Sequence, residues 1–204
     1  RRALPAFLKA KELLGAGEIG WPVNIRLTLH WAAKEINQTE QEMNWRVSPE
    51  VAGAGHFFDL ASHQFDYLDF VFGNVTGITG SASNLGGLYE AEDTVTASWL
   101  HASGITGNGS WSFIADEDAE TDEIEITGDK GSIHLSCFEK PDILKLVKDG
   151  QESVLQFENP EHISQHLVQQ VVDELRGVGE CLSTGASAAR TNWVLEDVVK
   201  DYYS

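Results

Sequence analysis

The sequence predicts an α+β domain with a large, open, mainly antiparallel β-sheet and helices packed on one face. First, polar and apolar residues alternate from residue 75 to residue 157, and short turns separate the alternating segments. Short spacers without helices are typical of antiparallel strands, because a parallel connection needs a long crossover. Second, segments with apolar residues at helical spacing lie before and after this region. Third, no complete glycine fingerprint follows a strand, so the chain contains no Rossmann unit.

Size and charge limit the classes of function. The 204 residues, 42% of them hydrophobic, suit one globular domain that spans residues 1–204. The 14 basic and 32 acidic residues give a net charge of -18. Phosphate backbones and anionic bilayers repel such a chain, so we exclude nonspecific binding to nucleic acid and to membranes. The sequence also lacks an apolar run long enough to span a bilayer.

The two cysteines indicate the compartment. Cys137 and Cys181 do not make a disulfide framework, so we expect reduced thiols and a cytoplasmic location. The sequence begins with Arg1 rather than Met, and we therefore expect it to be a piece of a longer protein. An export signal would then precede Arg1, and a periplasmic location stays open.

The first part of the chain predicts a helix, a strand and a loop. Residues 1–14 have the apolar spacing of an amphipathic helix. Residues 24–31 alternate between apolar and polar side chains, which predicts a half-buried strand. Residues 32–49 form a long polar segment that contains Trp45 and Arg46. Loops of this length in a compact domain are often functional.

Residues 51–73 are the stretch around which we expect the site to be organised. Small residues open it, and apolar residues at helical spacing continue to Gly73. Asp59 and His63 are four positions apart and therefore lie one turn apart on the same helix face. A carboxylate beside an imidazole is a natural acid/base pair. A polar pair without a chemical role is the simpler interpretation, and the commoner one for a lone pair of this kind.

A metal site is a second interpretation of the same helix. His56, Asp59 and His63 follow one another at i, i+3 and i+7, so their side chains share one side of a helix. Two imidazoles and a carboxylate can hold zinc or iron, as in a metal-dependent hydrolase or isomerase. The direction of His56 is open, because this residue begins the helix directly after a glycine.

The strands predicted after this helix are residues 75–84, 94–101, 106–114, 123–127, 132–136, 142–148 and 153–157. Several of them have one face of small polar groups, such as Thr96, Ser98 and Asn108. The opposite face is apolar and should carry the helices. A flat polar face suits either water or a second copy of the same sheet.

The remaining segments predict a turn and two helices. Seven acidic residues within residues 116–125 are typical of a solvated turn. Residues 162–176 predict an amphipathic helix with its apolar residues facing inward, and residues 186–203 predict the final helix. His162 and His166 are four positions apart, no acidic residue is expected to face them, and they are interpreted as a surface pair.

Several stretches resemble one family. They are WRVSPEVAGAGHFFDLASHQFDYLDFVFG (45–73), GAGEIGWPVNIR (15–26), EDTVTASWLHASGITG (92–107), IEITGDKGSIHLSCF (124–138) and STGASAARTNWVLEDV (183–198). In family order and across nearly the whole chain, they resemble the C-terminal domain of the Gfo/Idh/MocA oxidoreductases, the family of glucose–fructose oxidoreductase and inositol dehydrogenase.

The resemblance implies a two-domain enzyme acting on a sugar, a cyclitol or a derivative. An N-terminal Rossmann domain, absent from this chain, would hold most of an NAD or NADP cofactor. The C-terminal domain would resemble those of dihydrodipicolinate reductase and glyceraldehyde-3-phosphate dehydrogenase. It would supply the substrate wall and form a homodimer or homotetramer through its sheet. The alternative is a sheet-to-sheet binding module in a family member that has lost its redox chemistry.

The resemblance also assigns roles to residues. The family's Asp-x-x-x-His motif corresponds to Asp59 and His63, with His63 as acid/base and Asp59 as the residue that orients or binds the substrate. The glycines that approach the nicotinamide correspond to Gly53 and Gly55, and alanine replaces the middle glycine. Trp45 and Arg46 would border the sugar site. The Glu-Lys-Pro at residues 139–141 lies in the wrong domain for the family's lysine motif, so we do not assign it.

Overall fold

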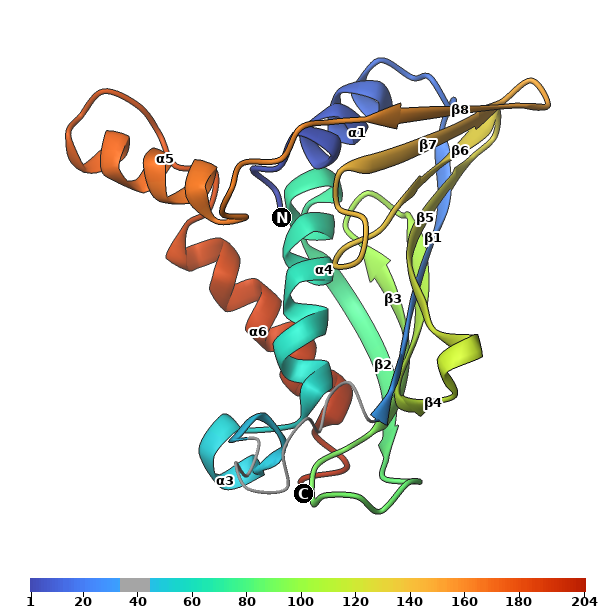
Figure 1. Cartoon of the computed structure of the whole chain (residues 1–204), viewed down its shortest axis with the longest axis vertical. Helices are drawn as coiled ribbons and strands as arrows, with labels where there is room; N and C mark the ends of the chain where they lie inside the picture. The colour runs from blue at the N-terminus through green and yellow to red at the C-terminus, as the bar shows by residue number, and fades with distance from the viewer. Residues whose placement is uncertain (34–44) are drawn as a thin grey trace.

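The computed structural model describes residues 1–33 and 45–204, and in them one sheet of eight strands carries the fold (Figure 1). The strands are β1 (Pro22–Ala32), β2 (Val75–Ser83), β3 (Thr94–His101), β4 (Thr106–Ala115), β5 (Thr121–Gly128), β6 (Gly131–Leu135), β7 (Ile143–Lys148) and β8 (Gln151–Gln156). The helices are α1 (Pro5–Gly15), α3 (Pro49–Ala52), α4 (His56–Phe72), α5 (Gln165–Leu175) and α6 (Gly185–Val199), with short 3₁₀ turns at η1 (Trp45–Val47) and η2 (Glu117–Ala119).

The predicted fold class is confirmed, with one change in the order of the strands. The sheet runs β2-β3-β4-β1-β5-β6-β7-β8, and its pairs are antiparallel except that β1 runs parallel to β4. The strands after α4 therefore do not form one continuous meander, because β1 separates β4 from β5. The first strand of the chain thus lies in the middle of the sheet.

The core lies between the apolar face of the sheet and the helices. Alternation along β1 places Ile25, Leu27 and Leu29 under the helices with no exposed surface. Spacings of three and four residues along α4 place Phe57 and Leu68 against that face, also fully buried. Figure 1 shows α1, α4 and α6 on the same side of the sheet.

Two glycines on β4 let tryptophans lie flat on the sheet. A Cβ at Gly107 would stand 2.1 Å from the ring of Trp99, and one at Gly109 would stand 2.3 Å from the ring of Trp111. Both distances are too short for real carbon atoms, so the indole rings occupy the space that side chains would take. These glycines fix the packing of α4, because Phe65 contacts Trp99 edge-on at a centroid distance of 5.0 Å.

Several predicted boundaries change. The first helix begins at Pro5 rather than at residue 1, since proline is favoured in the first turn and Leu4 is extended. The acidic segment 116–125 is a turn only in its first half. Its second half is the start of β5, where Asp122 accepts hydrogen bonds from the amides of Phe138 and Glu139. Most of the predicted loop 32–49 lies outside the described residues.

The helix predicted at 162–176 exists as α5, but its orientation differs from the prediction. None of its residues is buried, so its apolar side chains do not face inward. Cys137 and Cys181 are free thiols, as predicted. Among the described residues, no helix has the length and apolar character that a transmembrane segment requires.

Candidate active site

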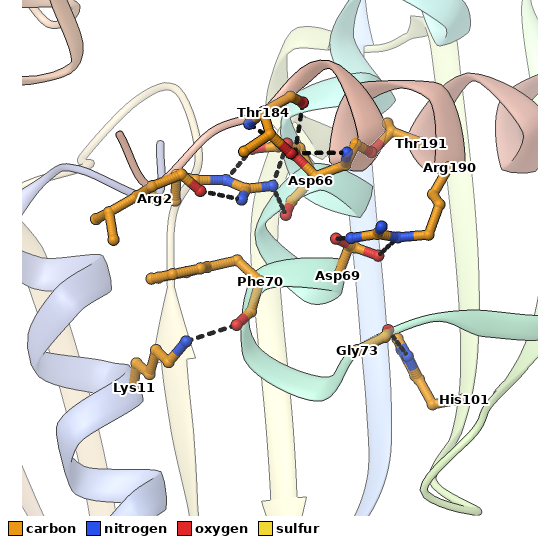
Figure 2. Close-up of polar contacts among 12 residues, drawn as sticks. Arg2, Lys11, Asp66, Asp69, Phe70, Gly73, His101, Thr184, Arg190 and Thr191 are labelled. Atoms are coloured by element: carbon orange, nitrogen blue, oxygen red, sulfur yellow. Dashed lines mark hydrogen bonds and ion pairs between the residues drawn. The ribbon is translucent and has the colours of Figure 1, made fainter. Parts of the chain in front are cut away.

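Arg2 fixes helix α4 at Asp66, one turn after His63. The Arg2 side chain is 4% exposed, and its Nε donates to Asp66 Oδ2 at 2.8 Å (Figure 2). A second nitrogen contacts Asp66 Oδ1, and the Asp66 carbonyl accepts at 3.0 Å. The remaining nitrogen donates to the Leu182 carbonyl at 2.7 Å. This bidentate, charge-assisted contact ties the first residues of the chain, α4 and the segment before α6 to one point.

Further contacts hold the second half of α4. Arg190 of α6 forms two hydrogen bonds to Asp69, at 2.8 and 2.7 Å. Lys11 of α1 donates to the Phe70 carbonyl at 2.6 Å, and Nδ1 of the buried His101 lies 2.8 Å from the Gly73 carbonyl (Figure 2). These carbonyls at the helix end have no partner within the helix, so the side chains replace the missing bonds. The position of α4 is thereby set from three neighbouring elements.

The buried Glu92 holds the beginning of α4. Its carboxylate has no exposed surface and accepts from the Gly55 amide at 2.9 and 3.0 Å, and the Tyr203 hydroxyl contacts it from the end of the chain. A Cβ at Gly55 would stand 2.8 Å from the Glu92 carbonyl, so only glycine fits there. Gly53 has a left-handed φ of 86° and nothing within 4 Å of its absent Cβ. The two glycines are thus required for different reasons.

His63 lies on the outer side of α4 and borders a cavity of about 530 Å³. Its ring contacts Phe138 edge-on at a centroid distance of 5.9 Å. Partial desolvation, with a smaller effect of the nearby Arg1 charge, lowers the pKa of His63 below 6.5, although Asp59 and Asp66 act in the opposite direction. The imidazole is therefore neutral at neutral pH and can accept a proton.

Part of the lining of the cavity beside His63 consists of polar side chains, and the rest is apolar or arginine. Ser62 and Asp66 come from α4, Ser183 precedes α6, and Thr191 and Asn192 lie on α6. Hydroxyl and amide groups both donate and accept hydrogen bonds, and a carboxylate accepts them. Such a lining suits a ligand with several hydroxyl groups.

Asp59 and His63 share a face of α4 but make different contacts. The Asp59 carboxylate accepts from Arg46 Nε at 2.8 Å, and the Arg46 guanidinium also lies over the Trp45 ring, 4.5 Å from its centroid. Within the described part of the chain, no hydrogen bond joins Asp59 to His63. The two are coupled through their charges, since Asp59 raises the pKa of His63. A small cluster thus forms near the start of α4, where Arg46 contacts both Asp59 and Trp45. Asp59 lies one helical turn before His63.

His56 does not form a cluster with the other two members of the predicted metal set. It is 4% exposed, and its ring lies between Phe113 and Tyr89 at centroid distances of 5.4 and 5.9 Å. Burial lowers the pKa of His56 to about 4, and its Nε2 is buried without a hydrogen-bond partner. The ligand atoms of His56, Asp59 and His63 do not gather within 4.8 Å in the described structure. The geometry therefore does not favour the metal-dependent alternative.

A different group, on the polar face of the sheet, has metal-ligand character. Glu123, Glu125 and His134 place one ligand atom each within 4.8 Å of one another. Arg26 forms ion pairs with both carboxylates, with a nitrogen 3.7 Å from Glu123 and a shorter contact to Glu125, and His134 Nδ1 lies 2.9 Å from Glu123. These contacts explain why the three side chains lie close together, as members of an ion-pair network with Arg26.

Sequence reasoning missed Arg2 and Glu92. A signal for Glu92 exists, because two adjacent acids, Glu92 and Asp93, directly precede an apolar strand and both prove fully buried. Arg2 offered no such signal, since its partners are 64 and 180 positions away.

A family comparison agrees with this geometry. Residues 7–134 match the model of the GFO/IDH/MocA C-terminal domain. The chain belongs to the GFO/IDH/MocA family. The matched region includes α4 with Asp59 and His63, the strands β1 to β5, and both glycines at the start of the helix.

Known relatives of this GFO/IDH/MocA chain are oxidoreductases. It is 33% identical over 172 residues to Oxidoreductase P35 of Formosa agariphila, which covers 84% of this chain and 52% of that protein. A levoglucosan dehydrogenase solved with NADH and levoglucosan has a TM-score of 0.82 and 18% identity over 99% of this chain and 62% of its own. An oxidoreductase from Agrobacterium radiobacter, solved with NAD+, L-tartaric acid and magnesium, has a TM-score of 0.76 and 21% identity over 100% of this chain and 61% of its own.

The similarity to the solved structures shows the shared fold. The GFO/IDH/MocA chain spans about half the length of the curated relative it matches. Each of these relatives therefore contains a substantial region that has no counterpart in the 204 residues.

Proposed function

We propose that this chain is the substrate-binding half of a two-domain, nicotinamide-dependent oxidoreductase that acts on a sugar, a cyclitol or a derivative. A preceding Rossmann domain would hold most of the cofactor, either NAD or NADP. The observation that carries the proposal is the neutral His63 at the edge of a cavity whose mixed lining includes several hydroxyl groups and an amide. Family membership and the NADH- and levoglucosan-bound relative support the same reading.

His63 would act as the acid/base for the substrate hydroxyl. Oxidation of a secondary alcohol requires a base at oxygen while hydride leaves carbon, and a bound nicotinamide supplies the hydride acceptor. The lowered pKa keeps the His63 imidazole ready to accept this proton at neutral pH. Asp59 would orient the substrate or bind it, and its charge would stabilise the imidazolium that forms.

Other residues would form the walls of the site. Trp45 and Arg46 adjoin Asp59 and would border the substrate. Gly53 fits a close contact with the cofactor, because the space beside its Cα is open. The Gly55 amide already donates to Glu92 and is not free to bind the cofactor. Gly55 would instead allow the backbone to turn beside the cofactor.

Kinetics of the full-length protein with its nucleotide-binding domain would test His63. We expect His63→Ala to lower kcat by about 10²–10⁴. In the unmodified enzyme, kcat/KM for oxidation should fall as the pH drops below the lowered pKa of His63, because the imidazolium cannot accept a proton. His134→Ala, on the opposite face of the sheet, is the matched control and should keep its rate.

An unchanged rate in His63→Ala would remove this residue from the role of base. Titration of NADH and NADPH into the 204-residue chain tests whether the other domain holds most of the cofactor. If it does, the 204-residue chain alone should bind both nucleotides weakly. Micromolar affinity of the isolated chain would contradict the proposed two-domain arrangement.

A further inference from the structure

Helix α5 exposes most of its apolar side chains to solvent, and two of its three partly covered positions are polar. Leu167, Gln170 and Asp173 are its partly covered positions. The exposed apolar positions form a stripe at i, i+3, i+4 and i+7, with Val168 58%, Val171 42%, Val172 41% and Leu175 83% exposed. A surface helix normally buries its apolar side, so this arrangement is inverted.

Few contacts hold α5 to the rest of the chain. His166 Nδ1 lies 3.3 Å from the Ala3 carbonyl, and the Leu182 amide donates to Gln170 at 3.2 Å. Figure 1 shows the helix standing away from the sheet and from α4. An isolated helix of 11 residues is marginal in water, and most helices gain their stability from packing of the apolar face. We therefore expect another protein surface to pack on the stripe formed by Val168, Val171, Val172 and Leu175.

The position of α5 indicates which partner this is. Ile163, Ser164 and Leu167, at the start of the helix, line the same cavity as His63. Arg1, Arg2 and Ala3 line it too, so a segment joined to the beginning of this chain would emerge beside α5. The relatives contain the additional region described above, and those solved with NAD+ or NADH match this chain over only 61% and 62% of their length.

We infer that the apolar stripe of α5 is the docking surface for a nucleotide-binding domain of the same polypeptide, placed before Arg1. This inference rests on the proposed function. Hydride transfer requires the nicotinamide carbon to contact the substrate carbon, so the domain that holds the cofactor must reach the cavity at His63. Because α5 forms one edge of that cavity, a domain seated on the stripe both closes the cavity and covers the exposed valines and leucine.

Hydrogen exchange of the α5 amides tests the inference. In the full-length protein these amides should exchange at least about tenfold more slowly than in the 204-residue chain, because docking suppresses local opening. The double variant Val171→Glu/Leu175→Glu should lose this protection in the full-length protein. It should leave the thermal midpoint of the 204-residue chain unchanged, since neither side chain is buried there.

Leu85→Glu is the matched control, because Leu85 is 71% exposed and lies in the β2–β3 loop, away from α5. It should change neither protection nor stability in either form. Equal exchange of the α5 amides in the two forms would overturn the inference. Protection of α5 in the 204-residue chain that grows with its concentration would overturn it in favour of a second copy.

Binding of NADH and of NADPH, measured on the same full-length sample, separates this inference from the proposed function. Tight binding of either nucleotide with unprotected α5 amides would refute the docking surface and leave the oxidoreductase assignment in place. A full-length protein that binds neither NADH nor NADPH would refute the assignment itself, and the inference with it.

Discussion

Two histidines on helix α4 meet opposite surroundings. His56 begins the helix and is packed between aromatic rings, with a pKa lowered to about 4. His63 lies two turns later beside a cavity of mixed lining. Burial lowers both pKa values, but only His63 has room for a ligand beside its ring. The difference in surroundings supports the proposed chemical role of His63 and gives His56 a role in packing.

His56 makes the stability of the fold depend on pH. Its pKa is about 4 in the folded chain and 6.5 in an ordinary environment, so the unfolded chain takes up the proton first as the pH falls. The free energy of unfolding should therefore decrease between pH 6.5 and pH 4, by up to about 3 kcal/mol from this residue, and should not depend on it above pH 6.5.

Urea unfolding at pH 7 and pH 5 checks this expectation. His56→Gln removes the titrating group. Between pH 7 and pH 5, the free energy of unfolding of this variant should therefore decrease less than that of the unmodified chain. The comparison isolates His56 from the other histidines with lowered pKa values. Equal losses in the two proteins would show that His56 is protonated as readily in the folded state as in the unfolded state.

At the residue scale, the sequence predicted the Asp59/His63 pair but not the residues that surround it. The i, i+4 spacing of Asp59 and His63 predicted a shared helix face, because helix geometry is local. The partner of Asp59 could also have been suspected, since Arg46 is only 13 positions away. The cavity could not be predicted, because Ser183 and Asn192 reach it only through the packing of α6.

At the scale of elements, helix α4 depends on contacts from outside itself. Its N-terminal end is bound by Glu92, its middle by Arg2 and its last turns by Arg190, Lys11 and His101. A helix held in this way keeps its side chains at fixed positions, which the proposed site for hydride transfer would need.

Removal of the Arg2 side chain should be strongly destabilising. Arg2→Ala leaves Asp66 and the Leu182 carbonyl without their partner in a largely buried place, and breaking such a contact costs about 3–5 kcal/mol. Denaturant unfolding of the 204-residue chain measures the loss. Arg2→Lys should recover little of it, because lysine cannot form the bidentate contact.

Lys9→Ala is the control for a surface ion pair. Lys9 contacts Glu12 at 2.7 Å, but the Glu12 side chain is 67% exposed. Such pairs contribute about 0–1 kcal/mol, so this variant should unfold almost like the unmodified chain. A similar loss in Lys9→Ala and Arg2→Ala would show that the Arg2 contact has no special weight.

Helix α5 shows where element prediction fails. Its apolar spacing correctly predicted an amphipathic helix, because periodicity depends on local sequence. Periodicity cannot tell which body the apolar side will meet, and the assumption that it meets this domain was wrong. The helix predicted at residues 186–203 exists as α6, although it ends at Val199, and its apolar side does pack on α4 and β2.

At the scale of the whole molecule, one face of the sheet carries no helix in the described structure. Thr96 and Ser98 of β3 lie beside Ser110 and Asn108 of β4, and Thr28 of β1 extends this row of small polar groups. Assembly into a homodimer or homotetramer through this face stays a prediction.

Light scattering of the 204-residue chain tests this assembly. We expect a dimer or larger species, and Thr96→Arg should shift it to monomer, because a long charged side chain would prevent close approach of two sheets. Glu12→Arg, an exposed change on α1, should leave the species unchanged. A monomer at all concentrations in the unmodified chain would refute assembly through the sheet.

The fold class was predictable because alternation and short turns are local, whereas the strand order was not. Nothing in residues 24–31 reveals that this strand enters between β4 and β5. The pairing is decided by long-range matching of Ile25 and Leu27 with Ile126 and Ile124, which bury their side chains on the same face. Register of that kind depends on the complete sheet.

The central place of β1 has a consequence for biosynthesis. Its residue Asn24 pairs with Thr106 on one side and with Thr127 on the other, so both neighbours leave the ribosome about 80 to 100 residues later. Until then its aliphatic side chains and both hydrogen-bonding edges are open to other nascent chains. We therefore expect the half-made polypeptide to depend on molecular chaperones, and mutations that slow the joining of β1 should reduce cellular yield before they reduce the stability of the finished protein.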